Sequence, residues 1–285
     1  MTFIPDQRID QLISEDIPYL DLTCELLGIG GRRGRMEYLT REDCVLAGGD
    51  VAAGVMERLG ATVVSLEPDG SRIAAGGTLM VVEGAAGQLH MGWKVALNLF
   101  DHLSGVATKT RRMVDAAHRA NPSCEVLTTR KSLPGAKDLL TLAVHAGGAW
   151  PHRLGLSETV LVFSQHVAFL DGMDGLARRL AEVRGSCVEK KLFVEAGPDE
   201  ALELARGLDG RRLVDGIQLD KIPVDQLADL VLRLREADPQ LTLIAAGGVN
   251  EGNAESYAAT GVDGIATTAP FNAPPIDMTA RMEAI

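Results

Sequence analysis

Residues 191–220, KLFVEAGPDEALELARGLDGRRLVDGIQLD, contain one complete strand–helix–strand unit. The apolar runs Lys191–Glu195 and Gly216–Leu219 have the length of buried strands, and between them apolar residues recur at helical spacing over 201–205. Two strands joined by a helix normally pair in parallel. This stretch therefore predicts an α/β fold that is built around a parallel sheet.

The same alternation extends over most of the chain after residue 120. Six strands are predicted, at Glu125–Thr128, Thr159–Phe163, Lys191–Glu195, Gly216–Leu219, Leu241–Ala245 and Gly264–Thr267. Six β-α units fit a closed or incomplete barrel, or an open doubly wound sheet. The nucleotide-binding patterns G-x-G-x-x-G and G-x-x-x-x-G-K-[ST] are missing, which weakens the doubly wound alternative.

The chain before residue 105 has a different pattern. Short β-rich runs at Cys44–Ala47, Ala61–Leu66 and Thr78–Glu83 are separated by glycine-containing turns, which predicts a small, largely antiparallel sheet. A long helical tract from His90 to about Arg119 follows, and an interruption is expected at Leu103-Ser104-Gly105. The helix would link the two halves.

Composition limits the classes of function. The chain has 285 residues, 46% of them hydrophobic, and a formal net charge of -11, which argues against nucleic acid as a partner. No uncharged apolar run is long enough for a membrane span, and no secretion signal is expected. The cysteines lack a C-x-x-C pair, so we expect neither a zinc site nor a disulfide framework, and a cytoplasmic location fits best. They are Cys24, Cys44, Cys124 and Cys187.

Positive side chains gather between Leu127 and Leu156, against the overall charge of the chain. They are Arg130, Lys131, Lys137, His152 and Arg153, near Pro134-Gly135 and the glycine pair Gly147-Gly148. Arginine offers a planar fork of donors and lysine a point charge, and glycine lets backbone N–H groups approach an anion. The cluster predicts a small anionic substrate.

In a β/α barrel the active site lies at the carboxyl ends of the strands. The residues that follow the six predicted strands are Thr129-Arg130-Lys131, Gln165-His166, Glu195, Asp220-Lys221, Gly247-Gly248 and Thr267-Thr268. Glu195 and Asp220 could hold a divalent ion or sugar hydroxyls, or they are solvated carboxylates. Gly247-Gly248 precedes a helix expected from about Glu251 and forms either a phosphate site or a plain tight turn.

Two common hydrolase patterns are missing. Ser104 and Ser132 have no G-x-S-x-G setting, and no H-E-x-x-H is present. His152 binds an anion or only satisfies local backbone groups. Cations together with two carboxylates suit transfer at a phosphorylated sugar, where diphosphate leaves as an anion and Mg²⁺ neutralises it.

The segments that carry these residues resemble the quinolinate phosphoribosyltransferase family, also called nicotinate-nucleotide pyrophosphorylases. The similarity covers nearly the whole chain and rests on several short motifs. They are Ala96-Leu97-Asn98, His102-Leu103-Ser104-Gly105, Thr129-Arg130-Lys131-Ser132 with Pro134-Gly135, Gly147-Gly148, His152-Arg153, Glu195, Leu219-Asp220, Gly247-Gly248 and Thr260-Gly261-Val262-Asp263.

The resemblance implies a type II phosphoribosyltransferase fold. It consists of an N-terminal open-faced α/β sandwich over residues 1–105 and an incomplete parallel α/β barrel over 106–268, with the tail 269–285 packing back on the first domain. The family also implies a homodimer whose active site is shared across the interface. Phosphoribosyl pyrophosphate and Mg²⁺ would be the co-substrate and the cofactor.

The resemblance also implies roles for single residues. Glu195, Asp220 and Lys131 would be catalytic, and the two acids would address the ribose and the Mg²⁺. Residues that contact the substrate would be Lys94, Thr129, Arg130, His152 and Arg153, and those that contact phosphate would be Gly247, Gly248 and Thr268.

The chain departs from the family pattern at five positions. Lys94 replaces an arginine, Phe163 a lysine, Ala246 a serine, Ile244 a glutamate and Thr268 a glycine. This pattern is similar to the ModD branch of pyrophosphorylases, a group associated with molybdenum transport loci. It favours phosphoribosyl transfer to an anionic, carboxylated acceptor other than quinolinate. An authentic carboxylating nicotinate-nucleotide pyrophosphorylase of NAD biosynthesis and a non-catalytic oxyanion-binding protein stay open as alternatives.

Overall fold

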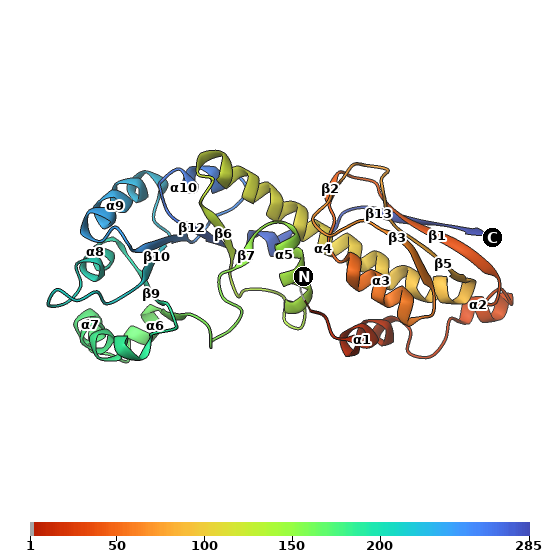
Figure 1. Cartoon of the computed structure of the whole chain (residues 1–285), viewed down its shortest axis with the longest axis horizontal. Coiled ribbons are helices and arrows are strands. Elements are labelled where there is room, and N and C mark those ends of the chain that lie inside the picture. Colours follow the sequence, from red (N-terminus) through yellow and green to blue (C-terminus); the bar gives the residue numbers. More distant parts are fainter. Residues whose placement is uncertain (1–2) are drawn as a thin grey trace. The chain divides into compact units, whose positions relative to one another are not determined.

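The structure, a computed structural model, describes residues 3–285 and divides into two compact units (Figure 1). The first unit holds the described residues up to Arg111 together with 132–149 and 270–285, and the second holds 112–131 and 150–269. Within residues 3–285, none of the helices combines the length and the apolar composition that crossing a bilayer requires.

The first unit contains a four-stranded antiparallel sheet in the order β13-β1-β5-β3. Its strands are β1 (Arg33–Thr40), β3 (Thr62–Leu66), β5 (Thr78–Ala85) and β13 (Met278–Ala284). As far as Tyr38, buried side chains of β1 alternate with exposed or half-buried ones, so its apolar face joins the core while Arg33, Arg35 and Glu37 face away. The predicted strand at Cys44–Ala47 is shorter, and β2 (Cys44–Val45) pairs only with β4 (Arg72–Ile73).

Several helices complete the first unit. They are α1 (Asp6–Asp16), α2 (Leu22–Leu27), α3 (Gly49–Arg58), α5 (Lys137–Ala146) and the part of α4 (Ala86–Ala120) up to Arg111. The buried side chains of the sheet, of α3 and of α4 form one core cluster that includes Tyr38, Met56 and Phe100.

The expected interruption of the long helix is wrong, because α4 runs unbroken from Ala86 to Ala120. Gly105 serves close packing rather than a turn. A Cβ atom there would lie 2.2 Å from the carbonyl oxygen of Pro274, so only glycine lets this segment approach the helix. Ser104 and Thr108 are also compatible with the helix, since their hydroxyls accept hydrogen bonds from the backbone N–H groups of Ala47 and Val45.

The second unit contains a seven-stranded sheet in the order β7-β6-β12-β11-β10-β9-β8, and all its pairs are parallel. The strands are β6 (Glu125–Thr128), β7 (Trp150–Pro151), β8 (Val160–Val162), β9 (Leu192–Ala196), β10 (Gly216–Asp220), β11 (Thr242–Ala246) and β12 (Gly264–Thr267). The six predicted strands are all present, and the short edge strand β7 is an addition.

Helices alternate with these strands, as Figure 1 shows for α8, α9 and α10. The helical segments are α6 (Ser164–Val167), α7 (Gly172–Val183), η1 (Arg184–Ser186), α8 (Pro198–Arg206), α9 (Val224–Ala237) and α10 (Ala254–Ala258), and η2 (Ala269–Asn272) follows β12. The sheet ends at β7 and β8, which are not paired with each other in the described residues. The curled parallel sheet with two open edges confirms the predicted incomplete barrel.

The register of the sheet aligns the carboxyl ends of its strands. Asp220 lies beside Ala246, Ala246 beside Ala266, and Ala266 beside Leu127. Residues that follow these four positions therefore emerge at the same edge of the sheet. This is the edge at which the sequence places the candidate residues.

Candidate active site

Two acidic side chains lie close together on the neighbouring strands β9 and β10. Glu195 is the register partner of Gln218, whose Nε2 donates a hydrogen bond to Glu195 Oε2, and Asp220 is two residues further along β10 on the same face. Burial, and then the negative charge of Asp220, raise the pKa of Glu195 above its usual value. The two carboxylates are therefore near enough to repel each other.

Such a pair fits a divalent cation. Carboxylate oxygens are the ligands that Mg²⁺ prefers, and a cation between Glu195 and Asp220 would remove the repulsion that adds to the effect of burial on the pKa of Glu195. Gln218, which orients Glu195, was not among the predicted site residues. Its spacing of two from Asp220 within a strand is the signal that could have identified it.

A glycine turn lies directly against the acidic pair. Gly247 has φ +86°, and a Cβ atom there would lie 2.8 Å from Asp220 Oδ1 and 2.7 Å from the backbone nitrogen of Lys221. Only glycine fits this space. Gly248 has φ +78°, and no atom lies within 4 Å of a Cβ position there, so the space beside this residue is empty of protein atoms.

The loop after the glycine pair is held by two asparagines. Asn250 and Asn253 both donate side-chain hydrogen bonds to the carbonyl oxygen of Gly248, at 2.9 and 3.1 Å. The helix expected from about Glu251 begins at Ala254 and has only five residues. The helix dipole therefore contributes little here, and a phosphate contact would depend on backbone N–H groups of the turn.

Threonines join the ends of β6 and β12. The hydroxyls of Thr129 and Thr268 lie 2.9 Å apart, and the backbone N–H of Lys131 donates to Thr129 Oγ1 at 3.3 Å. The positive charge of Lys131 lowers the pKa of Glu195, although burial outweighs it. Lys131 is thus near enough to the acidic pair to act on it electrostatically.

Two arginines lie near each other at the same edge. Burial, and then the charge of Arg130, lower the pKa of Arg153, which remains a cation at any physiological pH. Within residues 3–285, neither guanidinium forms an ion pair with a carboxylate. Two unpaired guanidinium groups of like charge favour an anionic ligand between them.

His152 is positioned by its backbone. Its N–H donates to the carbonyl oxygen of Thr128 at 2.8 Å, and its ring lies edge-on to Phe193 with centroids 6.4 Å apart. Burial and the nearby Arg153 lower the pKa of His152, so the ring is neutral at pH 7. Nε2 is buried and has no hydrogen-bond partner in the described chain, which leaves it available to a ligand.

Phe163 lies beside these cations. The guanidinium carbon of Arg153 is 5.6 Å from the centroid of the Phe163 ring, a cation–π distance. Phe163 also packs against the apolar cluster at the inner face of the sheet. His166 serves the local fold, because its Nδ1 accepts a hydrogen bond from the backbone N–H of Phe163 at the start of α6.

Two predicted cations belong to the first unit. Lys94 is exposed on α4, with Nζ 5.0 Å from the centroid of the Trp93 ring, and Lys137 begins α5. Neither is part of the group that the second unit assembles. That group contains Thr129, Arg130, Lys131, His152, Arg153, Glu195, Asp220, Gly247, Gly248 and Thr268.

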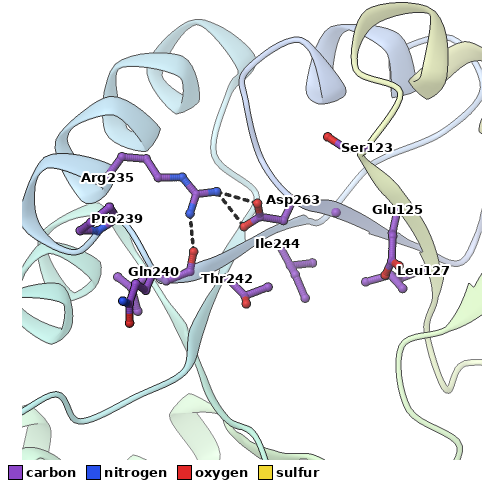
Figure 2. A pocket seen from close by; sticks show the side chains of 11 residues that line it. Ser123, Glu125, Leu127, Arg235, Pro239, Gln240, Thr242, Ile244 and Asp263 are labelled. Atoms are coloured by element: carbon purple, nitrogen blue, oxygen red, sulfur yellow. Dashed lines mark hydrogen bonds and ion pairs between the residues drawn. The ribbon is translucent and has the colours of Figure 1, made fainter.

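A cavity of about 430 Å³ in the second unit lies at the opposite end of the strands (Figure 2). Glu125, Thr242 and Gly264, which begin β6, β11 and β12, line it. Arg235 points across it and donates to both carboxylate oxygens of Asp263 at 2.7 Å.

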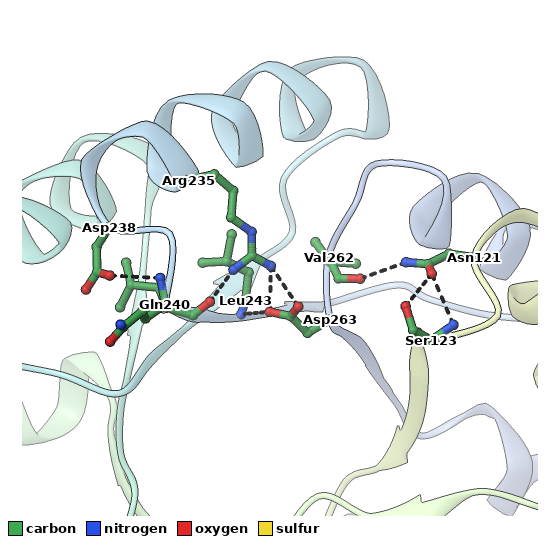
Figure 3. A network of polar contacts seen from close by, with 9 residues as sticks. Asn121, Ser123, Arg235, Asp238, Gln240, Leu243, Val262 and Asp263 are labelled. Carbon is green, nitrogen blue, oxygen red and sulfur yellow. Dashed lines mark hydrogen bonds and ion pairs between the residues drawn. The ribbon is translucent and has the colours of Figure 1, made fainter.

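The polar groups around this cavity satisfy one another (Figure 3). Asp263 also accepts from the backbone N–H of Leu243, and Asn121 donates to the carbonyl oxygen of Val262. In β/α barrels, residues at the amino ends of the strands stabilise the fold, whereas catalysis occurs at the carboxyl ends. We therefore place the candidate active site at the carboxyl ends of the strands, opposite this cavity.

Comparison with known proteins identifies the family of the chain. The profile of the quinolinate phosphoribosyl transferase C-terminal domain matches residues 106–281, and that of the N-terminal domain matches 21–104. The chain is 38% identical to a Rhodobacter capsulatus protein named as a ModD pyrophosphorylase, over 89% of this chain and 96% of the relative. It is 31% identical to a nicotinate-nucleotide pyrophosphorylase of Synechocystis, over 99% and 95% of the two chains.

The fold is also that of solved structures. The nicotinate-nucleotide pyrophosphorylase from Francisella tularensis superposes with a TM-score of 0.86 at 23% identity, covering 99% of this chain and 98% of that chain. The chain belongs to the quinolinate phosphoribosyltransferase family, and the resemblance to its ModD branch is confirmed. It is therefore a phosphoribosyltransferase, a glycosyltransferase by class, that acts on an anionic acceptor.

Proposed function

We propose that this enzyme transfers the phosphoribosyl group of phosphoribosyl pyrophosphate to a carboxylated acceptor other than quinolinate. The observation that carries the proposal is the contact of Phe163 with Arg153, at 5.6 Å, within the group of cations and acids at the carboxyl ends of the strands. In the family pattern a lysine occupies the position of Phe163. An apolar ring there removes one positive charge from the acceptor side and adds a flat surface.

On the acceptor side, Arg130 and Arg153 would bind a carboxylate, because both are unpaired cations within the described chain. The neutral ring of His152 would add a hydrogen bond through its free Nε2. Phe163 would lie against an apolar or aromatic part of the acceptor. This combination favours an acceptor with one carboxylate and one flat apolar face over a dicarboxylate.

On the donor side, the ribose and the diphosphate would lie at Glu195, Asp220 and the Gly247-Gly248 turn. The nucleophilic atom of the acceptor forms a bond to C1 of the ribose, and the bond from C1 to the diphosphate oxygen breaks, with the electron pair leaving on diphosphate. Glu195 and Asp220 would stabilise the positive charge that develops on the sugar, and Lys131 would attract the diphosphate.

We propose Mg²⁺ as the cofactor. Glu195 and Asp220 would hold it, since burial and then the charge of Asp220 raise the pKa of Glu195 and a cation would relieve the repulsion. Bound there, Mg²⁺ supplies charge neutralisation for the leaving diphosphate.

We also propose a homodimer with an active site that is shared between subunits. The segment 19–27 exposes Tyr19 by 92% and Leu26 by 78%, and Leu20, Leu22 and Leu27 are exposed as well. A monomer gains nothing from so much exposed apolar surface, whereas a partner subunit would cover it. The exposed Lys94 would then be free to enter the active site of the partner.

We place the enzyme in the cytoplasm. All four cysteines are free thiols, which persist in a reducing compartment.

The carboxylating nicotinate-nucleotide pyrophosphorylase activity is a second candidate, favoured by the 31% identity to the Synechocystis protein. It predicts release of carbon dioxide when quinolinate is the acceptor. The test is diphosphate release from phosphoribosyl pyrophosphate and Mg²⁺ with a panel of aromatic monocarboxylates and quinolinate. The proposal expects turnover with a monocarboxylate and little with quinolinate.

Carbon dioxide release with quinolinate as the best acceptor would establish the second candidate instead. Failure to consume phosphoribosyl pyrophosphate with any carboxylate would contradict both. A thermal shift with molybdate alone would then support an oxyanion-binding protein, because a ligand that binds the native state raises its apparent stability.

The variant Phe163→Lys tests the assignment of the acceptor pocket directly. A lysine there restores the cation, so the ratio of kcat/KM for a dicarboxylate to that for a monocarboxylate should rise at least about tenfold. Phe169→Lys is the matched control, since Phe169 is 91% exposed six residues further along. An equal change of the ratio in both variants would contradict the role of Phe163.

A further inference from the structure

Three potential metal ligands of different chemistry meet in the first unit. A carboxylate oxygen of Asp21, the thiol sulfur of Cys24 and a ring nitrogen of His90 all lie within 4.8 Å of one another. Asp21 is the N-cap of α2, Cys24 lies in α2, and His90 lies in the first turns of α4. We propose that these three side chains form a site for Zn²⁺ or a similar thiophilic divalent cation.

The donor set selects the metal. Thiolate and imidazole favour Zn²⁺ over Mg²⁺, which prefers oxygen ligands. A site with one Cys, one His and one Asp supplies three of the four ligands of a tetrahedral ion, and water or a group from another molecule supplies the fourth. Binding replaces the thiol proton of Cys24, which is released to solvent, so thiolate and carboxylate together balance the two charges of the ion.

The local structure orients all three groups. Asp21 Oδ1 accepts a hydrogen bond from the backbone N–H of Cys24 at 3.1 Å, and the thiol of Cys24 interacts with the same carboxylate. Cys24 is the one buried side chain of α2, so its sulfur points inward. The ring of His90 lies edge-on to Trp93 with centroids 6.2 Å apart, which holds the ring in place.

A simpler explanation covers only two of the three residues. Asp21 is an N-cap and Cys24 a small buried anchor, and both roles need no metal. Neither role accounts for His90, a half-buried imidazole that reaches the same point from a helix 66 residues further along the chain. A metal gives one reason for all three positions.

A metal ion would stabilise the short helix α2. It has six residues, too few for a stable helix in isolation, and Leu22, Leu26 and Leu27 on it are more than 60% exposed. A metal bound to Asp21, Cys24 and His90 would tie α2 to the long helix α4. The ion would thereby fix the exposed apolar residues of segment 19–27 in one arrangement.

The experiment titrates Co²⁺ and Zn²⁺ into the full chain after its metals have been removed with a chelator. We expect about one Co²⁺ per chain with thiolate-to-cobalt absorption, displacement by Zn²⁺ and a rise in Tm, whereas excess Mg²⁺ displaces nothing. Cys24→Ser should abolish the absorption, and His90→Gln should weaken Co²⁺ binding at least about tenfold. Cys187→Ser is the matched control and should keep the full signal.

Absence of thiolate absorption, or its persistence in Cys24→Ser, would overturn the proposal. If Cys24→Ser does not fold, His90→Gln decides, because unchanged Co²⁺ affinity in that variant also contradicts the site. The metal-free variants should unfold at the same temperature as the metal-free wild type. These readouts do not depend on catalysis, so they are independent of the proposed transferase activity.

Discussion

The two ends of the parallel sheet use charge in opposite ways. At the amino ends, Asp215 and Asp263 directly precede β10 and β12, and each accepts hydrogen bonds from an arginine and from a backbone N–H of the neighbouring strand. At the carboxyl ends, like charges lie together. Besides burial, Arg130 lowers the pKa of Arg153, and Asp220 raises that of Glu195, although Asp220 also forms an ion pair with the exposed Lys221 at 3.4 Å.

This difference in charge pairing indicates that the amino ends of the strands stabilise the fold and that the carboxyl ends bind a ligand. Opposite charges that satisfy each other stabilise the folded chain and leave little to offer a ligand, as in the network of Figure 3. Like charges held together destabilise the free protein until a ligand of opposite sign binds. Substitutions at the two ends should therefore have opposite effects on activity and on stability.

The largest effect is expected for Glu195→Gln and Asp220→Asn. Each should lower kcat/KM on the order of a thousandfold, because developing charge on the sugar loses its stabilisation. Tm should stay equal or rise, since the repulsion between the carboxylates is removed. Steady-state kinetics and thermal unfolding measure both, and Glu203→Gln, on the exposed side of α8, is the control. A fall in Tm that parallels the loss of activity would mean that the pair is structural.

Arg153→Lys should raise KM for the acceptor by about 10- to 100-fold and leave KM for phosphoribosyl pyrophosphate nearly unchanged. Lysine keeps the charge but loses the planar fork and the contact with the Phe163 ring. Initial-rate kinetics with each substrate varied in turn provides the measurement. Arg178→Lys, at an exposed position of α7, should change neither constant. Equal increases in both KM values would place Arg153 outside the acceptor pocket.

Asp215→Asn should lower the free energy of unfolding by about 2 kcal/mol at pH 7 and leave kcat unchanged. Hydrogen bonding to Arg184 lowers the pKa of Asp215, so its stabilisation is present above the usual value of 3.8 and is lost as pH falls through the lower folded value. Denaturant unfolding from pH 7 down to about pH 2 should show the two proteins converging in acid. A constant difference at every pH would mean that packing, not ionisation, is responsible.

The smallest effect is expected for an exposed ion pair. Arg179 and Glu182 on α7 are 2.8 Å apart, but their side chains are 59% and 64% exposed. Arg179→Ala should change the free energy of unfolding by less than about 0.5 kcal/mol, because solvent screens the pair. Denaturant unfolding at low and high salt checks this, and a larger, salt-sensitive loss would show that exposed pairs also hold this unit together.

Periodicity predicted the second unit well. All six predicted strands are present, because strands that are buried in a parallel sheet form short apolar runs with helices between them. The first unit was predicted less completely. β1 and β13, which pair along seven positions, mix charged and apolar residues and were not recognised, since their partner is more than 200 residues away.

The candidate residues show the same division. Glu195, Asp220 and the Gly247-Gly248 turn could be selected from the sequence because they follow predicted strands, and a parallel register brings the carboxyl ends of strands together. Gln218 was overlooked, although its spacing of two from Asp220 was a signal, because its contact with Glu195 depends on the register between β9 and β10. The expectation of no zinc site depended on the spacing between cysteines. The cluster of Cys24 with Asp21 and His90 forms only when the chain folds, because His90 is far from the other two in the sequence.

By itself, the sequence determined the class of the fold, the family and the types of side chain at the carboxyl ends of the strands, since these depend on local periodicity and on motifs. Tertiary structure alone decided which charges are neutralised and which are left for a ligand. It also decided that Gly105 packs against Pro274 instead of breaking a helix. The physical reason is that pairing, burial and close approach depend on distances between residues far apart in the chain, and spacing along the chain does not contain those distances.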